Sequence, residues 1–65
     1  MHIKLNGEEQ EISATTLQQL VVDLGLEVRM IAIEHNREVA PRGRWSSTTI
    51  VDGDQIEIVH MIGGG

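Results

Sequence analysis

Apolar and polar residues alternate at the start of the chain, which indicates a β-hairpin. Ile3 and Leu5 are separated by one polar residue, the spacing of a strand with one buried face. Asn6-Gly7 comes next, and both residues tolerate the positive φ that a two-residue hairpin turn requires. The return strand is expected over residues 9–14.

A short amphipathic helix follows this hairpin. Four apolar residues recur at i, i+3, i+4 and i+7 and form one stripe that can face a sheet: Leu17, Leu20, Val21 and Leu24. Either Thr15 or Thr16 can cap the helix, because a glutamine lies three residues after each and completes a capping box. Gly25 can adopt the left-handed backbone that ends a helix.

A second hairpin is predicted after the helix. Ile31 and Ile33 share one face of a strand. After a turn at residues 34–37, a short strand at 38–40 ends before Pro41, which has no N–H to donate to a ladder.

A connector and a final strand complete the pattern. Residues 42–47 are expected to be irregular, with Trp45 folded into the core. The final strand covers residues 55–62, and Ile56 and Ile58 share the face directed at the helix. Its opposite face carries a different set: Glu57, Val59 and Met61.

Together these elements predict an α+β fold, a mixed sheet of four or five strands with one main helix packed on one face. The final strand has the densest apolar content, so it is expected to lie between other strands. Sixty-five residues allow one domain. We place that domain at residues 1–62, with a flexible glycine tail at 63–65.

Composition excludes several classes of function. The chain has no cysteine, so it fits a reducing cytoplasm and cannot carry sulfur on a thiol of its own. Five scattered basic residues and a net charge of −5 argue against nucleic-acid binding. No apolar run approaches the roughly 20 residues that cross a bilayer, which argues against a membrane span. The acidic surface suits solubility, and it equally suits attraction to a basic protein partner.

Stability does not explain Gly63-Gly64-Gly65, because glycine adds no packing and loses the most entropy when it is ordered. These residues give a thin strip of backbone that can enter a narrow cleft and present the carboxylate of Gly65 to an active site. The carboxylate is ionised at neutral pH, so it can attack the α-phosphorus of ATP and form an acyl-adenylate. A sulfur nucleophile can then displace the adenylate. A frayed end or a cloning remnant is the alternative explanation.

The remaining polar candidates suggest ordinary structural roles. Three histidines lack metal-ligand spacing and are expected on the surface or on strand faces: His2, His35 and His60. Asp52-Gly53-Asp54 forms a turn that needs no metal, since no further acidic ligands lie at loop spacing. Trp45 is interpreted as a core residue. Arg42 either pairs with an acidic neighbour or contacts a partner.

The outward face of the final strand is the predicted docking surface. A strand that faces solvent more often carries polar residues, yet Val59 and Met61 are apolar and precede the glycine tail. Methionine suits contact with more than one partner because its unbranched side chain can repack. With Glu57 and Arg42, these residues make up the predicted partner-binding set.

Two segments carry a resemblance to a known family. Residues 31–45 combine an apolar strand, an Asn-centred turn and Ala-Pro-Arg with a tryptophan close behind, and residues 52–65 combine a Gly-Asp turn, a strand and a glycine end. In these features the chain resembles ThiS, the family of sulfur carriers of thiamine biosynthesis, which implies a ubiquitin-like β-grasp fold. The chain departs from the family pattern at Ala40 before the proline, at Arg37 in the turn and at the additional glycine, Gly63.

The resemblance implies a carrier protein and not an enzyme. An adenylyltransferase related to the ubiquitin E1 family (ThiF-like) would adenylate Gly65 with Mg-ATP, and a sulfurtransferase or cysteine desulfurase would supply the sulfur of a thiocarboxylate. Thiazole synthase (ThiG-like) would then receive this sulfur for the thiazole ring of thiamine. ATP and Mg belong to the activating partner, so the chain itself is expected to bind no cofactor and to be a monomer when free.

Three other functions stay open at this point. The chain could be the small subunit of molybdopterin synthase, which shares the fold and chemistry but is usually longer. It could be a ubiquitin-like modifier joined through Gly65 to lysines of other proteins. It could also be a plain β-grasp binding module with an inert tail.

Overall fold

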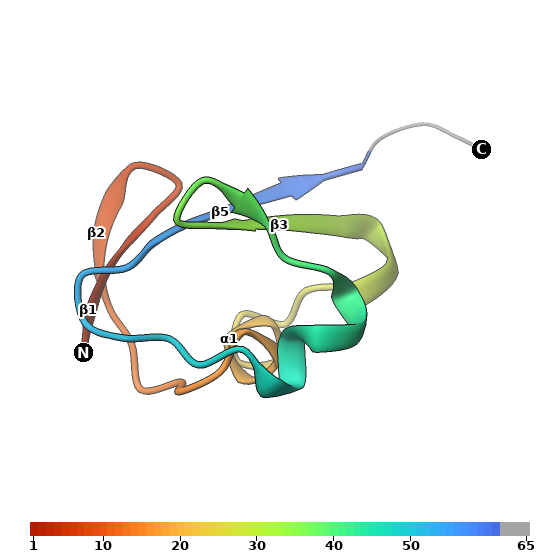
Figure 1. Ribbon diagram of the computed structural model, residues 1–65. Coiled ribbons are helices and arrows are strands. Elements are labelled where there is room, and N and C mark those ends of the chain that lie inside the picture. The colour runs from red at the N-terminus through yellow and green to blue at the C-terminus, as the bar shows by residue number, and fades with distance from the viewer. Residues whose placement is uncertain (62–65) are drawn as a thin grey trace.

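The computed structural model describes residues 1–61, which form a five-stranded sheet with one α-helix against it (Figure 1). The elements are β1 (His2–Leu5), β2 (Glu8–Glu11), α1 (Leu17–Asp23), β3 (Ile31–His35), β4 (Glu38–Val39) and β5 (Gln55–His60). The strand order β2-β1-β5-β3-β4 places β5 in the centre, which confirms the prediction for the final strand. Because β5 runs parallel to β1 and antiparallel to β3, the sheet is mixed. The predicted glycine tail at 63–65 lies outside the described residues.

The first hairpin turns where the sequence predicted. Asn6 and Gly7 have φ angles of 50° and 84°, as a two-residue turn requires. The return strand β2 begins earlier and ends earlier than the predicted 9–14. The strand ends at Glu11, and Ile12 still exchanges backbone hydrogen bonds with Met1. The chain then leaves the sheet, because Ala14 is buried in the core on the way to the helix.

Helix α1 starts as predicted and ends one residue early. Thr16 is its cap, with the Thr16 hydroxyl oxygen accepting the backbone N–H of Gln19 at 3.2 Å. The Gln19 side chain donates to Asp23 instead of returning to the cap, so only half of the capping box forms. Leu24 was predicted in the buried stripe, and this is wrong: it lies at the C-cap and is 44% exposed. The left-handed Gly25, with φ 68°, ends the helix at this point.

The second half also departs from the prediction in detail. The β3–β4 turn is made by Asn36 and Arg37, both with positive φ. Residues 42–47, expected to be irregular, form a 3-10 helix, η2 (Arg42–Ser47). A second short 3-10 helix, η1 (Val28–Met30), was not predicted from any pattern. The final strand ends at His60 and not at residue 62.

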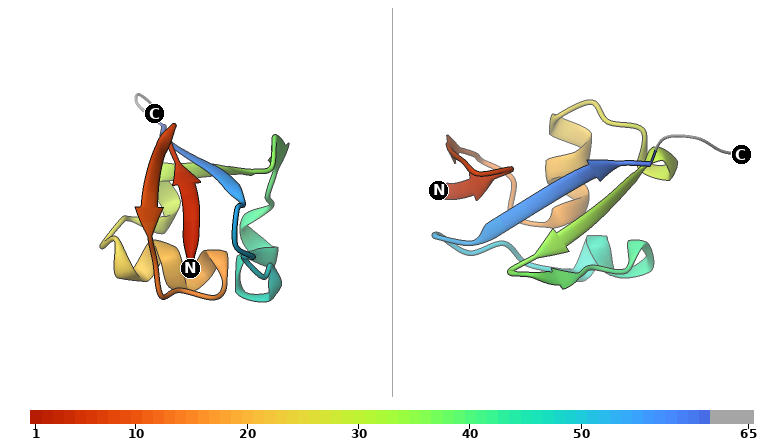
Figure 2. Two further views of the ribbon diagram at one scale, coloured as in Figure 1. Left: turned by 90° about the vertical axis from the view of Figure 1, so that its left-hand side faces the viewer. Right: turned by 90° about the horizontal axis from the view of Figure 1, so that it is seen from above.

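The core lies between the sheet and the layer formed by α1 and η2, which cover the same face (Figure 2). It is aliphatic around a single tryptophan, and its largest fully buried side chains are Trp45, Ile3, Leu17, Leu20, Ile31, Ile33, Ile56 and Val21. The Trp45 indole N–H donates to the carbonyl of Ala40 at 2.8 Å, which satisfies the one polar atom of that side chain. No helix within residues 1–61 is long and apolar enough to cross a membrane.

Candidate functional site

The candidate site begins on the face of β5 that α1 does not cover. Ile56 and Ile58 point into the core and are buried, whereas Glu57 and Val59 alternate with them and are exposed. Val59 is 53% exposed and lies opposite Ala32 of β3 in the antiparallel register. The outward position predicted for Glu57 and Val59 is therefore confirmed, although their contact with a partner stays a prediction.

Met61 and Arg42 come together just beyond the end of β5. Both line a shallow hollow of about 180 Å³, whose walls also include Val39 and Trp45. Met61 is 46% exposed, and its backbone N–H donates to the carbonyl of Met30 at 2.7 Å, so its main chain is held in place. This hollow offers an apolar surface beside the point where the chain continues toward Gly65.

Arg42 lies over the ring of Trp45, with 5.8 Å between the guanidinium carbon and the ring centroid. One guanidinium nitrogen also points at the carbonyl of Ile31, at the long distance of 3.5 Å. Within residues 1–61 it forms no ion pair, so of the two alternatives for Arg42 the pairing with an acidic neighbour is not found there. A cation stacked on tryptophan at an exposed site contributes about 0.5–1 kcal/mol. Arg42 is thus oriented by stacking and keeps donors available at the surface.

Glu57 belongs to a different part of the same face. It lies opposite Glu34 in the register, and both line a hollow of about 270 Å³ together with Arg37 and Gln55. Two like charges directly opposite each other on a sheet are destabilising. The predicted partner-binding residues therefore lie in two areas. Met61 and Arg42 line the apolar hollow, which we call the apolar end, and Glu57 lies at the acidic end. Val59 lies between the two ends.

Two residues that were not predicted from the sequence enlarge the apolar end. Val39 is 72% exposed and is the Cα partner of Glu34, which places it on the outward face with Val59. Ala32, also exposed, is the Cα partner of Val59 and lines the same hollow as Val39 and Met61. We call Ala32, Val39, Val59 and Met61 the outer patch. Alternation across β3 and β4 would have identified Ala32 and Val39, but a two-residue strand gives almost no periodic signal.

A buried polar cluster fixes the start of β5. Asp54 is only 6% exposed; one carboxylate oxygen lies 2.7 Å from His35 Nε2 and accepts the Val51 N–H at 2.9 Å. The other oxygen accepts the Asn36 side-chain amide at 3.1 Å. Burial raises the pKa of Asp54, but the hydrogen bonds from His35, Val51 and Asn36 outweigh it, and the pKa lies below its usual value. Sequence reasoning identified the Asp52-Gly53-Asp54 turn but not this cluster.

The other histidines lie apart from this cluster. His2 pairs with Glu11 at 2.8 Å on the surface, and His60 is exposed at the end of β5. Within residues 1–61, no group of three or more histidine, aspartate or glutamate side chains is arranged to hold a metal ion.

The order and geometry of these elements match one family. The model of the ThiS family matches residues 3–65. The chain belongs to the ThiS family. It is 34% identical to the sulfur carrier protein ThiS of Bacillus subtilis, over 97% of this chain and 98% of that protein. The crystal structure of the thiamine biosynthesis protein ThiS from Geobacter metallireducens superposes with a TM-score of 0.87 at 28% identity, over all of both chains.

A longer relative also contains a ThiS-like segment. The chain is 41% identical, over its whole length, to a thiazole synthase of Paramagnetospirillum magneticum, and it spans 20% of the length of that protein. The family match confirms the predicted ubiquitin-like β-grasp fold, and it covers the glycine residues that were predicted to carry the chemistry.

Proposed function

We propose that the chain is a sulfur carrier for the thiazole moiety of thiamine, with the carboxylate of Gly65 as the group that is adenylated and converted to a thiocarboxylate. The observation that carries this proposal is the match to the ThiS family over residues 3–65, which includes the terminal glycines. Relatives of full matching length are named sulfur carrier proteins. The absence of cysteine is consistent with this role, because the sulfur must then be carried on a carboxyl carbon.

The chain itself contributes positioning and recognition. Central strand β5 is fixed on both sides, by β1 and β3, and at its start by the Asp54 cluster. A partner that binds this rigid body thereby holds the point from which the chain continues to Gly65. Holding a reactant in a defined position accounts for a large part of many enzymatic rate enhancements.

The resemblance to the ThiS family implies the partners. An E1-like adenylyltransferase supplies Mg-ATP and forms the acyl-adenylate with release of pyrophosphate. The terminal sulfur of a persulfide on a sulfurtransferase, charged by a cysteine desulfurase, then attacks the carbonyl carbon and displaces AMP, which forms an acyl disulfide. A second thiol on the partner enzyme attacks the sulfurtransferase cysteine sulfur, forms a disulfide with it and releases the thiocarboxylate. Thiazole synthase takes the sulfur. A thiazole synthase that contains a ThiS-like segment within its own chain supports the last of these partnerships.

Mass analysis of the intact protein, purified from its native cells, tests the proposal. We expect a fraction of the chain to be heavier by the exchange of one oxygen for sulfur, and we expect fragmentation to place that change on the last residue. Growth without thiamine should enlarge this fraction. Covalent conjugates to lysines of other proteins, with no sulfur-containing form under either condition, would replace the carrier role by that of a protein modifier.

A further inference from the structure

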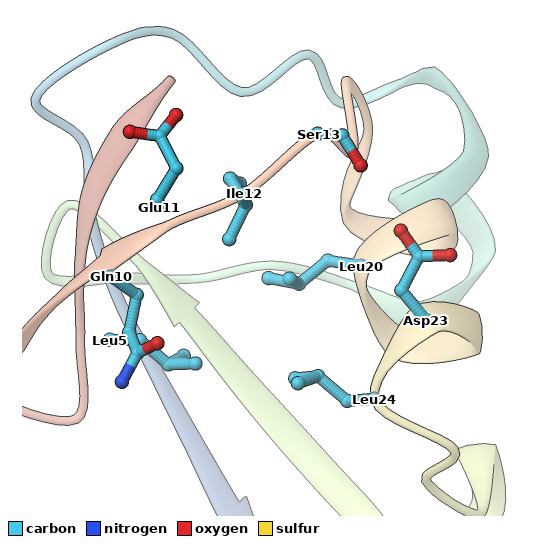
Figure 3. Close-up of a pocket in the computed structure, with 8 residues that line it drawn as sticks. All are labelled: Leu5, Gln10, Glu11, Ile12, Ser13, Leu20, Asp23 and Leu24. Atoms are coloured by element: carbon cyan, nitrogen blue, oxygen red, sulfur yellow. The ribbon is translucent and has the colours of Figure 1, made fainter.

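A second hollow lies between strand β2 and helix α1, at the edge of the sheet away from β4 (Figure 3). Its walls are half apolar and half polar, and the polar residues are Gln10, Glu11, Ser13 and Asp23. Leu5, Ile12, Leu20 and Leu24 point toward one another across it (Figure 3). Its volume is about 210 Å³, below the roughly 300–1,000 Å³ of small-molecule sites. Leu24, the residue that did not join the core, is 44% exposed on its rim. The hollow suits one or two side chains of a macromolecule better than a cofactor.

The backbone of β2 offers hydrogen bonds beside this hollow. β2 pairs only with β1 among the described strands, so its other edge is open. Ile12 and Met1 exchange two backbone hydrogen bonds, at 2.8 and 3.1 Å, and are therefore a hydrogen-bonded pair of the antiparallel ladder. Because bonded and non-bonded pairs alternate, the N–H and C=O groups of Glu9 and Glu11 point away from β1. These four groups face the open edge.

The side chains of β2 divide by face. Gln10 pairs with the buried Ile3 and lies on the face that bears the hollow, whereas Glu9 pairs with Lys4 and lies on the opposite face, like Glu11. Three of the four residues of β2 are glutamates, and all four are exposed. An added strand would therefore meet the partly apolar hollow, with Asp23 on its wall, on one face. On the other face it would meet the carboxylates of Glu9 and Glu11, of which Glu11 also pairs with the N-terminal ammonium and with His2.

We propose that the β2 edge binds an extended, basic segment of a partner protein, which adds a sixth strand to the sheet. In this segment, aliphatic side chains alternate with lysine or arginine. The aliphatic side chains enter the hollow beside Leu24, and the basic ones lie next to Glu9 and Glu11. Main-chain hydrogen bonds provide affinity in this mode of recognition, and the alternating side chains provide specificity.

Charge decides between the possible occupants of this edge. A second copy of this chain would bring a net charge of −5 and another row of glutamates to the edge, so self-association is opposed. The opposite edge differs. Strand β4 has two residues and is closely followed by Pro41, which lacks an N–H, so that edge offers little to an added strand.

The β2 edge lies at the end of the molecule away from the end of β5 (Figure 2). A partner bound there leaves the outer patch accessible. The inference does not depend on the sulfur-carrier function, and its test needs no enzyme of that pathway.

The test uses isotopically labelled protein and a short capped peptide in which lysine alternates with leucine. We expect the backbone amides of Glu9 and Glu11 to shift and to exchange more slowly with solvent as the peptide is added. Binding should weaken as salt is raised. Two control peptides should not bind: one with glutamate in place of lysine, and one N-methylated along its backbone.

Variants separate the contributions of the hollow, the charge and the backbone. Leu24→Asp should weaken peptide binding by about tenfold or more, whereas Val22→Asp, at an exposed site on the same helix, should not. Glu9→Lys should weaken it several-fold, and Glu38→Lys on β4 should not. Glu9→Pro removes one outward N–H at an edge position that tolerates proline, and it should also weaken binding. Melting curves of each variant establish that it is folded.

Two results would overturn the proposal. One is unchanged exchange of the Glu9 and Glu11 amides at saturating lysine peptide, or equal binding of the glutamate peptide. The other is concentration-dependent dimerisation through β2, measured by sedimentation, which would assign this edge to a second copy of the chain.

Discussion

At the scale of single residues, Asp54 shows how a polar group can hold a small sheet together. Its carboxylate is buried and accepts hydrogen bonds from Val51 and Asn36, with His35 as a third partner. Leaving such a group without partners would cost about 1–3 kcal/mol. Here the donors come from β3, from the turn after it and from the segment before β5. The same side chain therefore joins two segments that are distant in sequence, the end of β3 with its turn and the segment before β5.

We predict that Asp54→Asn lowers the free energy of unfolding by about 1–3 kcal/mol at pH 7, because a side-chain amide cannot accept all of these hydrogen bonds. Since folding lowers the pKa of Asp54 from its usual value near 3.8, the stabilisation is present above that pH and is lost as pH falls through the lowered pKa. Urea unfolding of both proteins should thus show a difference that disappears in acid. Glu38→Gln, at an exposed carboxylate, is the control, and a difference that persisted unchanged at pH 2 would contradict the explanation.

At the scale of elements, the sequence predicted correctly the features that depend on residues close to each other in the chain. Four such features located their helix, turn or strand correctly: the Asn-Gly turn, the threonine cap, Gly25 at the helix end and the alternation in β5. The errors arose where tertiary packing decides. Leu24 fits the helical stripe by spacing, but the helix ends before it. Residues 42–47 have no apolar periodicity, and their helical form follows from the burial of Trp45.

The exposed position of Leu24 and the buried position of Leu20 allow a test within one segment. Leu20 is 1% exposed, so Leu20→Ala should lower the free energy of unfolding by about 2–5 kcal/mol. Ile58→Ala on the facing strand should cost a similar amount. Leu24→Ala removes the same atoms from a half-exposed site and should cost less than about 1 kcal/mol. Denaturant unfolding measures the free energy of unfolding of all three variants. Equal losses of this free energy for Leu20→Ala and Leu24→Ala would show that Leu24 belongs to the core.

At the scale of the whole molecule, the sequence indicated the type of function better than the surfaces that serve it. The family resemblance and the glycine end suggested the carrier chemistry, because both are local in sequence. The outer patch is not local, since Ala32, Val39 and Val59 come together only through the pairing of β3 with both of its neighbours. The β2 edge likewise became visible only once the strand order was known.

One prediction concerns the residue proposed to react. Adding a single residue after Gly65 should abolish adenylation by the activating enzyme, because the glycine carboxylate is then part of a peptide bond. The melting temperature should change little, since glycine contributes no side chain to the core. Exchange of labelled pyrophosphate into ATP measures the adenylation step directly. Exchange at the normal rate with the extended protein would show that another group reacts.

The outer patch gives the last prediction, which concerns how a partner holds the carrier. Val59 and Met61 are both about half exposed, and they lie at and just after the end of β5, close in sequence to the glycines. Placing carboxylates there opposes burial of the patch against another protein, so Val59→Asp and Met61→Asp should each weaken binding to the adenylyltransferase and to thiazole synthase. Val22→Asp and Val51→Asp make the same change at exposed sites elsewhere and should leave both affinities unaltered. Calorimetric titration against each partner provides the affinities, with circular dichroism to establish folding. A folded Val59→Asp/Met61→Asp protein with unchanged affinities would move the docking surface away from the end of β5.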